Sequence, residues 1–184
     1  MAKFFESITP DLIEFIGQQK IFFTGTAAAD GRVNVSPKGM DSLRVLGPNR
    51  VLWLNLTGSG NETAAQIREV NRITIMFCAF DGKPLILRLY GTATAIHTGD
   101  AQWEELYGHF NETAGARQIF DVTIESVQTS CGFAVPLMEY KEDRDVLKNW
   151  AEKKGEAGIR DYWEQKNVTS IDGLPTGIFD TPEE

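Results

Sequence analysis

The sequence has few of the residues on which several large classes of function depend. It holds two cysteines, Cys78 and Cys131, and two histidines, His97 and His109, among 184 residues. Two cysteines are too few for a disulfide framework, and both lie in apolar, strand-like segments where buried free thiols are common. Neither histidine is spaced with cysteines or carboxylates as a metal ligand would be, so we expect no metal site.

Positive charge and long apolar runs are also scarce. The 18 lysines and arginines are outnumbered by 26 aspartates and glutamates, which gives a formal net charge of −8 at pH 7. This balance argues against binding to the phosphate backbone of a nucleic acid, and any anionic ligand must be held by local geometry. No stretch is apolar enough to span a membrane, and Asp11 and Glu14 interrupt the first apolar segment. We therefore expect a cytoplasmic protein that binds neither nucleic acid nor membrane.

The N-terminal part of the chain predicts a helix followed by a hairpin. Thr9-Pro10-Asp11 begins a short helix, because proline suits the first helical position and an acid suits the first turn. The segment 21–28 is rich in β-branched and aromatic residues, and Asp30-Gly31 supplies a turn. Val33 and Val35 then alternate with polar residues, as expected of a returning strand.

The rest of the chain alternates strands with short helices. Strands are predicted over 51–56, 73–80, 85–96 and 120–135, and helices over 61–70 and near 103–110. Two more apolar helical stripes follow, around Val146 and Ile159, and the segment from Asn167 has the composition of an arm or a loosely held end. The length suits one domain over 1–184 without repeats. We predict an α+β fold around an antiparallel barrel, with 141–184 as a helical C-terminal extension.

Two segments carry the clearest signal for chemistry. Ser36-Pro37-Lys38-Gly39 ends one predicted strand, and Gly58-Ser59-Gly60-Asn61-Glu62-Thr63 begins a predicted helix. A helix N-terminus offers free backbone N–H groups and the positive end of its dipole, while glycines let an anion approach the backbone. With the charge of Lys38, these features describe a phosphate cradle. The alternative is a plain strand-to-helix loop capped by Asn61.

Three pieces of the sequence occur together in an order typical of a known family. They are the segment from Asp30 to Gly39, the loop and helix start just described, and Arg88-Leu89-Tyr90-Gly91. In this order they resemble the pyridoxamine 5'-phosphate oxidase-like FMN-binding split-barrel family, over roughly residues 9 to 140. The resemblance implies a split β-barrel that dimerises and holds FMN at the subunit interface. It assigns FMN binding to the cradle residues Ser36, Pro37, Lys38, Asn61, Glu62 and Thr63.

The helix start also departs from that family. The pyridoxamine phosphate oxidases proper carry Ser-Arg-Lys where this chain has Asn61-Glu62-Thr63. The loss of two cations leaves the phosphate to backbone donors, the Thr63 hydroxyl and Lys38, and it requires Glu62 to point away or to meet a cation. The arginine and histidine that bind substrate phosphate in those oxidases are absent as well. The substrate is therefore undefined, and no side chain is identified as a catalytic acid or base.

Three further residues are candidates for contact with the flavin. Arg88 lies in the apolar run 85–90, where a guanidinium needs either a carboxylate or a ligand, and its position matches an arginine of the family. Ser130 and Cys131 belong to a segment that resembles the late strand beside the flavin, although Cys131 is alternatively a small buried residue. The run 85–90 is also too apolar to face water, which favours a homodimer.

The resulting hypothesis is a homodimeric FMN-binding flavoprotein that acts as an oxidoreductase on a small organic substrate. Two alternatives remain open. One is a protein that stores or senses FMN or haem without turnover, because the same scaffold carries either role. The other is a deazaflavin-dependent reductase whose cofactor phosphate sits in the same cradle.

Overall fold

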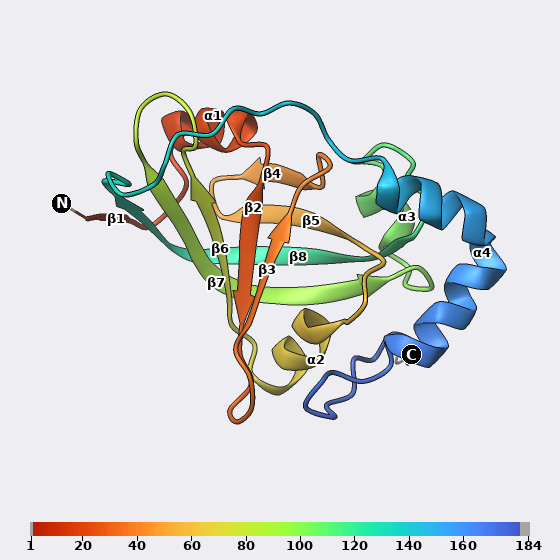
Figure 1. The fold of residues 1–184 in the computed structure, drawn as a ribbon. Helices are drawn as coiled ribbons and strands as arrows, with labels where there is room; N and C mark the ends of the chain where they lie inside the picture. The colour runs from red at the N-terminus through yellow and green to blue at the C-terminus, as the bar shows by residue number, and fades with distance from the viewer. Residues whose placement is uncertain (1, 181–184) are drawn as a thin grey trace.

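The computed structural model describes residues 2–180, which fold around one antiparallel sheet of eight strands (Figure 1). The strands are β1 (Lys3–Phe5), β2 (Phe22–Thr26), β3 (Asn34–Lys38), β4 (Leu43–Gly47), β5 (Arg50–Leu56), β6 (Ile73–Cys78), β7 (Ile86–His97) and β8 (Ala116–Ser130). Their order is β3-β2-β6-β7-β8-β5-β4, and β1 pairs with β8. Figure 1 shows β2 and β3 crossing in front of β5 and β8, so the sheet curls over on itself. The predicted α+β split barrel is confirmed.

Within residues 2–180, four helices lie around the barrel. They are α1 (Pro10–Gln18), α2 (Glu62–Glu69), α3 (Trp103–Tyr107) and α4 (Val146–Lys166). As predicted, α1 begins with Pro10 and carries Asp11 in its first turn, and it buries Leu12 and Ile16. The two predicted C-terminal stripes form α4, which is interrupted at Gly155, where φ is +66°.

The barrel core explains why the central strands are so apolar. Trp53 of β5 stacks on Phe120 of β8 with ring centroids 4.7 Å apart, and Phe22 of β2 meets Trp53 edge-on at 6.3 Å. On the opposite face of β5 and β8, a second cluster packs beneath α3 and includes Leu54 and Ile119. Both faces of these strands are covered, so consecutive residues along them are buried.

Leu87 and Leu89 of the run 85–90 pack within the chain itself, so the run does not by itself require a second subunit. Leu87 and Leu89 are in the barrel core, while Ile86, Arg88 and Tyr90 point outward and are half-buried. Alternation along β7 therefore places the most apolar side chains inside. Gly91 follows at a shift in the β7–β8 register, where a Cβ atom would collide with the Thr123 carbonyl oxygen.

The predicted end of the last strand is wrong. β8 stops at Ser130 instead of continuing to residue 135, because Gly132 takes a φ of +63° and turns the chain. Cys131 is consequently exposed, whereas the sequence suggested a buried thiol; Cys78 is buried as expected.

The segment after α4 is held tightly, contrary to the expectation of a loose end. Asn167 and Thr176 are fully buried, and Figure 1 shows the segment lying beside α2. Asp180 forms an ion pair with Arg68 of α2 at 2.8 Å. The predicted extension over 141–184 is thus an integral part of the fold as far as residue 180, and residues 181–184 lie outside the described part.

Candidate functional site

A cavity of about 590 Å³ lies between the end of β3, the loop before α2 and the C-terminal segment. It brings together five of the residues predicted for the cradle: Ser36, Lys38, Asn61, Glu62 and Thr63. The other lining residues are Asn34, Asn55, Leu56, Gly58, Ser59, Gly60, Arg117, Lys166, Thr169, Ser170 and Ile171. The two sequence segments chosen for their chemistry therefore meet in space.

The N-cap side chain of α2 makes no hydrogen bond to the first turn of the helix. Asn61 occupies the cap position, but its amide instead exchanges hydrogen bonds with the Gln118 amide of β8, at 2.7 and 3.3 Å. The alternative interpretation, in which Asn61 caps the helix, is wrong. Asn61 anchors the loop to the barrel, and its side chain leaves the first-turn N–H groups free for another acceptor.

A polar network fixes the start of α2 against the hairpin that carries Lys38. Asn34 donates to the hydroxyls of Thr63 and Thr26, at 3.1 Å in each case. Thr26 donates to the Gln66 amide oxygen at 2.7 Å, and the Gln66 amide donates to the Arg32 carbonyl at 2.8 Å. These bonds set the spacing between β3 and α2, which form two walls of the cavity.

Lys38 is the cation that the sequence placed in the cradle. Its Nζ lies 5.1 Å from the centre of the Trp53 ring, so the ammonium stands over an aromatic face. Burial, and to a lesser degree the charge of Arg117, lower the Lys38 pKa from 10.5 to about 8. Lys38 is therefore still protonated at neutral pH.

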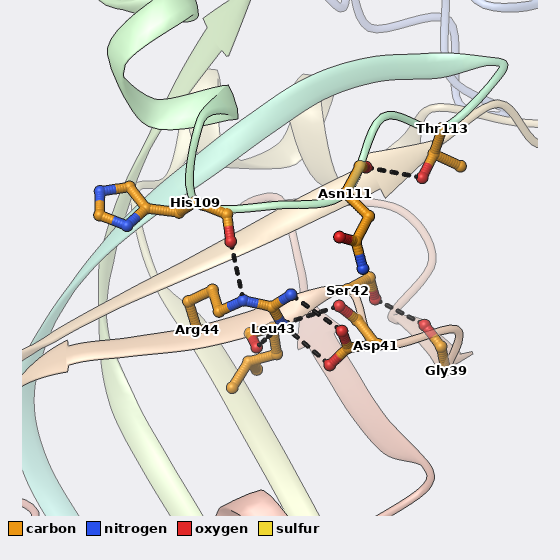
Figure 2. Close-up of polar contacts among 8 residues, drawn as sticks. All are labelled: Gly39, Asp41, Ser42, Leu43, Arg44, His109, Asn111 and Thr113. Atoms are coloured by element: carbon orange, nitrogen blue, oxygen red, sulfur yellow. Dashed lines mark hydrogen bonds and ion pairs between the residues drawn. The ribbon is translucent and has the colours of Figure 1, made fainter.

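The turn after Lys38 is strained and firmly held. Met40 and Asp41 adopt positive φ values of 59° and 53°, which side chains larger than glycine rarely take. Figure 2 shows the contacts that support this turn: the Ser42 hydroxyl donates to the Gly39 carbonyl at 2.7 Å, and Arg44 donates to both carboxylate oxygens of Asp41 at 2.9 Å. Arg44 also donates to the backbone carbonyl of His109 at 2.9 Å. The turn fixes the point where β3 ends and thus the position of Lys38.

Arg117 is a second cation of the cavity, which sequence reasoning missed. It is 2% exposed, and its Nη1 donates to the Gly60 carbonyl at 3.0 Å and to the Asn167 amide oxygen at 2.8 Å. The Asn55 amide oxygen, in the orientation that satisfies its neighbours, accepts from Nη2 at 2.9 Å. Burial lowers the Arg117 pKa to about 9, so the guanidinium is charged at neutral pH. The available signal was the polar pair Arg117-Gln118 directly before the apolar pair Ile119-Phe120 at the start of β8.

The C-terminal segment forms the third wall of the cavity and hydrogen-bonds to the Glu62 carboxylate. The Glu62 carboxylate accepts the backbone N–H of Ile171, at 3.1 and 3.2 Å to its two oxygens. Asn167 donates to the Gly58 carbonyl at 3.1 Å. Asp172 pairs with Arg32, whose backbone N–H and guanidinium lower the Asp172 pKa. Both carboxylates beside the cavity are thus engaged by donors of the protein itself.

A larger cavity of about 1300 Å³ lies on the other side of Lys38. Its walls come from the end of α1, the end of β3 and the segment leading into α4, and its apolar members include Phe23, Leu137 and Trp150. Lys38 lines both cavities, whereas Pro37 lines only the larger one. The structure therefore separates Pro37 from the other predicted cradle residues.

Arg88, Ser130 and Cys131 line neither of these two cavities. Arg88 Nη1 donates to the Ser130 hydroxyl at 3.3 Å, across the β7–β8 pair. Among residues 2–180 no ion pair involves Arg88, so the carboxylate considered for it is not present there. Within one chain, these residues form a separate cluster.

The described residues contain neither a cluster of metal ligands nor a membrane-spanning helix. No group of three or more histidine, cysteine, aspartate or glutamate side chains there is arranged to hold a metal ion. None of the helices between residues 2 and 180 is both long and apolar enough to cross a membrane.

Comparison with known proteins places the chain in a family. A family model described as pyridoxamine 5'-phosphate oxidase matches residues 8–131. A pyridoxamine 5'-phosphate oxidase family protein of Aspergillus flavus, ustO, is 37% identical over 195 residues, which cover 95% of this chain and 78% of the relative. The chain belongs to the pyridoxamine 5'-phosphate oxidase family. The family match contains both walls formed by β3 and α2, and it ends before the C-terminal segment.

Solved structures show that the fold of this pyridoxamine 5'-phosphate oxidase family member recurs. A putative pyridoxamine 5'-phosphate oxidase of Lactobacillus delbrueckii has a TM-score of 0.52 at 19% identity, over 67% of this chain and 94% of that one. HupZ of Group A Streptococcus scores 0.52 at 21% identity, over 65% and 91%. An FMN-binding protein of Syntrophomonas wolfei scores 0.50 at 14% identity, over 70% and 89%. At these identities the likeness concerns the fold.

Proposed function

We propose that this chain is an FMN-binding flavoprotein whose flavin phosphate occupies the 590 Å³ cavity, and that it is an oxidoreductase acting on a small organic substrate. One observation carries the proposal: Lys38, Arg117 and the uncapped start of α2 surround a single space. Cations and free helix N–H groups are the donors that a phosphate monoester prefers. The cavity volume is also typical of small-ligand sites, about 300–1,000 Å³.

The residues present suit the phosphate end of FMN. Lys38 supplies a charge at the cavity wall, the Ser36 and Thr63 hydroxyls line the space, and the loop 58–60 contains two glycines that allow close approach to the backbone. Thr63 is held by Asn34, and Glu62 is held by the Ile171 amide. FMN, when bound, would supply hydride or electron transfer, while these side chains bind and orient it.

The larger cavity is the proposed place for the substrate. Lys38 lines both this cavity and the phosphate cavity, so the two are neighbours. Phe23, Leu137 and Trp150 make part of the lining of the larger cavity apolar. Such walls favour an organic molecule with aromatic or aliphatic parts. Arg88, Ser130 and Cys131 lie outside both cavities, and we propose that they reach a flavin only across the interface of a homodimer.

The absorption spectrum of the purified protein tests this proposal. We expect flavin bands, release of FMN on denaturation, and bleaching of the bands when a nicotinamide cofactor is added without oxygen. Reoxidation by a small organic acceptor would establish turnover. A protein that binds FMN but is never reduced would be a storage or sensing protein. A haem Soret band, a deazaflavin spectrum or failure to bind FMN on reconstitution would overturn the proposal.

A further inference from the structure

Loop 169–175, within the segment after α4, is closed by its own hydrogen bonds. The Ser170 N–H donates to the Leu174 carbonyl at 2.8 Å, and the Gly173 N–H donates to the Ser170 carbonyl at 3.0 Å. The two end residues of the loop pair as an isolated antiparallel bridge. Gly173 takes a φ of +81°, which glycine adopts without steric cost. The loop therefore keeps its shape without help from the barrel.

The base of loop 169–175 is fixed in the protein interior. Asn167 and Thr176 lie on either side of the loop, and both are fully buried. The Thr176 hydroxyl donates to the Asn167 carbonyl at 2.6 Å, and the Thr176 N–H donates to the Val168 carbonyl at 3.1 Å. The Asn167 amide also donates to the Gly58 carbonyl at 3.1 Å. A movement of the loop relative to the barrel would therefore turn about this buried base.

The tip of loop 169–175 has two attachments to the barrel. The Ile171 N–H donates to the Glu62 carboxylate, at 3.1 and 3.2 Å to its two oxygens. The Asp172 carboxylate accepts the Arg32 N–H at 2.8 Å and pairs with the Arg32 guanidinium. Within residues 2–180, no other hydrogen bond leads from the loop to another part of the chain.

Both attachments lie at the surface, where such contacts contribute little stability. The Arg32 side chain is 68% exposed, and Ile171 is 69% exposed. Water and salt screen exposed ion pairs, and water competes for exposed hydrogen-bonding groups. The tip is therefore held much more weakly than the base.

The turn between β2 and β3 is shaped to receive the Asp172 carboxylate. Gly31 takes a φ of +100°, and a Cβ atom there would lie 2.6 Å from Asp172 Oδ2. Only glycine therefore combines this backbone conformation with so close an approach. The contact between the two turns is a specific one, although each partner is at the surface.

Loop 169–175 also forms part of the cavity wall. Thr169, Ser170 and Ile171 line the 590 Å³ cavity, and so does Glu62, which holds the tip. Asp172 is the next residue along the loop and does not line the cavity. Release of the two tip contacts would therefore open one wall of the cavity and leave the other two in place.

We propose that loop 169–175 is a flap that turns about its buried base to open and close this cavity, and that Asp172 is the latch that holds the flap shut. The inference goes beyond the proposed function and rests on it in one respect, namely that FMN is the ligand whose passage is measured. Lids of this kind control the entry and release of ligands without contributing to the chemistry.

Hydrogen exchange of the ligand-free protein, followed for single amides by NMR, tests the latch. In Asp172→Ala we expect the Ile171 N–H to exchange about 3- to 30-fold faster, as for the loss of one or two surface contacts. Its acceptor Glu62 is unaltered, so faster exchange reports opening of the flap. The Ser170 and Thr176 amides are bonded inside the flap and its base, and they should keep their protection.

Two further variants complete the exchange experiment. Asp172→Asn keeps an oxygen for the Arg32 N–H but loses the charge, so its Ile171 exchange should lie between those of the unaltered protein and Asp172→Ala. Asp180→Ala is the matched control, because it removes a surface carboxylate that pairs with Arg68 in the same segment but outside the flap. It should leave the Ile171 exchange unchanged.

The kinetics of FMN binding test whether the flap controls passage. By stopped-flow fluorescence, we expect both the association and the dissociation rate constants to be about 3- to 30-fold higher in Asp172→Ala than in the unaltered protein. The Kd should change by less than about threefold, because neither Asp172 nor Arg32 lines the cavity.

Unchanged Ile171 exchange in Asp172→Ala would show that Asp172 is no latch. An equal loss of protection at Ser170 and Thr176 would show that the loop melts instead of turning, and it would also overturn the inference. Faster FMN dissociation with unaltered association would do the same, since a flap acts on both directions. If the unaltered protein binds no FMN, the proposed function fails, and the exchange experiment alone decides whether the flap exists.

Discussion

The ammonium of Lys38 shows how burial gives one side chain a function that depends on pH. Its pKa is lowered to about 8 by burial and by Arg117, so in the ligand-free protein it is charged below this pH and neutral above it. The flavin phosphate is already fully ionised there, since its second pKa is near 6. We predict that FMN affinity falls progressively as the pH rises from neutrality through about 8.

Lys38→Ala should weaken FMN binding by about 1–3 kcal/mol at pH 7, the range for a lost charged hydrogen bond. It should also remove the inflection near pH 8, because the titrating group is gone. Fluorescence titration of FMN between pH 6.5 and 9.5 measures both effects. An inflection that persists in the alanine variant would assign it to another group, and an unchanged affinity would remove Lys38 from the site.

At the scale of elements, the C-terminal segment adds a third wall to the cradle formed by β3 and the start of α2. Asn167, at the end of α4, donates to the Gly58 carbonyl, accepts from Arg117 Nη1, and accepts the Thr176 hydroxyl with its own backbone carbonyl at 2.6 Å. One side chain thereby joins α4, β8 and the loop before α2. This segment lies beyond the family match at residues 8–131, but the alignment with the Aspergillus flavus family protein covers 95% of the chain.

We predict that Asn167→Ala lowers the free energy of unfolding by about 1–3 kcal/mol. The substitution removes one acceptor of the buried Arg117 guanidinium and the donor to the Gly58 carbonyl. Val168→Ala is the control: it alters the next residue, which is partly exposed, and should change stability by less than about 1 kcal/mol. Urea unfolding, with the midpoint and slope compared between variants, provides the measurement. Equal stabilities of the two variants would show that the segment does not pack as described.

At the scale of the whole molecule, the segment between β8 and α4 leaves several large apolar side chains exposed to solvent, which is unfavourable for an isolated chain. Phe133 and Leu137 are 81% and 77% exposed, and Met138 is 56% exposed. Figure 1 shows this segment running along the outside of the barrel from the end of β8, past α1, to α4. An apolar strip of this kind is typical of an interface between proteins.

We predict that two copies of the chain associate through this strip and that FMN stabilises the dimer by mass action. Sedimentation of the flavin-free and FMN-loaded protein across a dilution series measures the dimer dissociation constant, which should be lower with FMN. Phe133→Asp should raise it, since a charge would replace an apolar contact at an exposed residue that lines neither cavity. A monomer that binds FMN with undiminished affinity would show that the site is complete within one chain.

The sequence by itself determined most of the elements and one half of the site, whereas β1 and β4 were not among the predicted strands. Alternating apolar residues, the Asp30-Gly31 turn and Pro10 at a helix start are local signals, and the strands and helices that they predict are present. The meeting of Lys38 with the start of α2 followed from the order of short motifs. The elements depend on neighbours in sequence, so local patterns predict them, whereas the contact between Lys38 and the start of α2 was implied by the resemblance to the family.

Only the tertiary structure decided which polar groups are buried and which apolar groups are exposed. Arg117 is a cavity cation because β5, the loop 58–60 and Asn167 cover it, and Asn167 is 50 residues away along the chain. Cys131 is exposed because Gly132 turns the chain at the end of β8, and the C-terminal segment is ordered by contacts with α2 and the hairpin. Burial is set by segments that meet only after folding, so the local pattern of residues does not contain it.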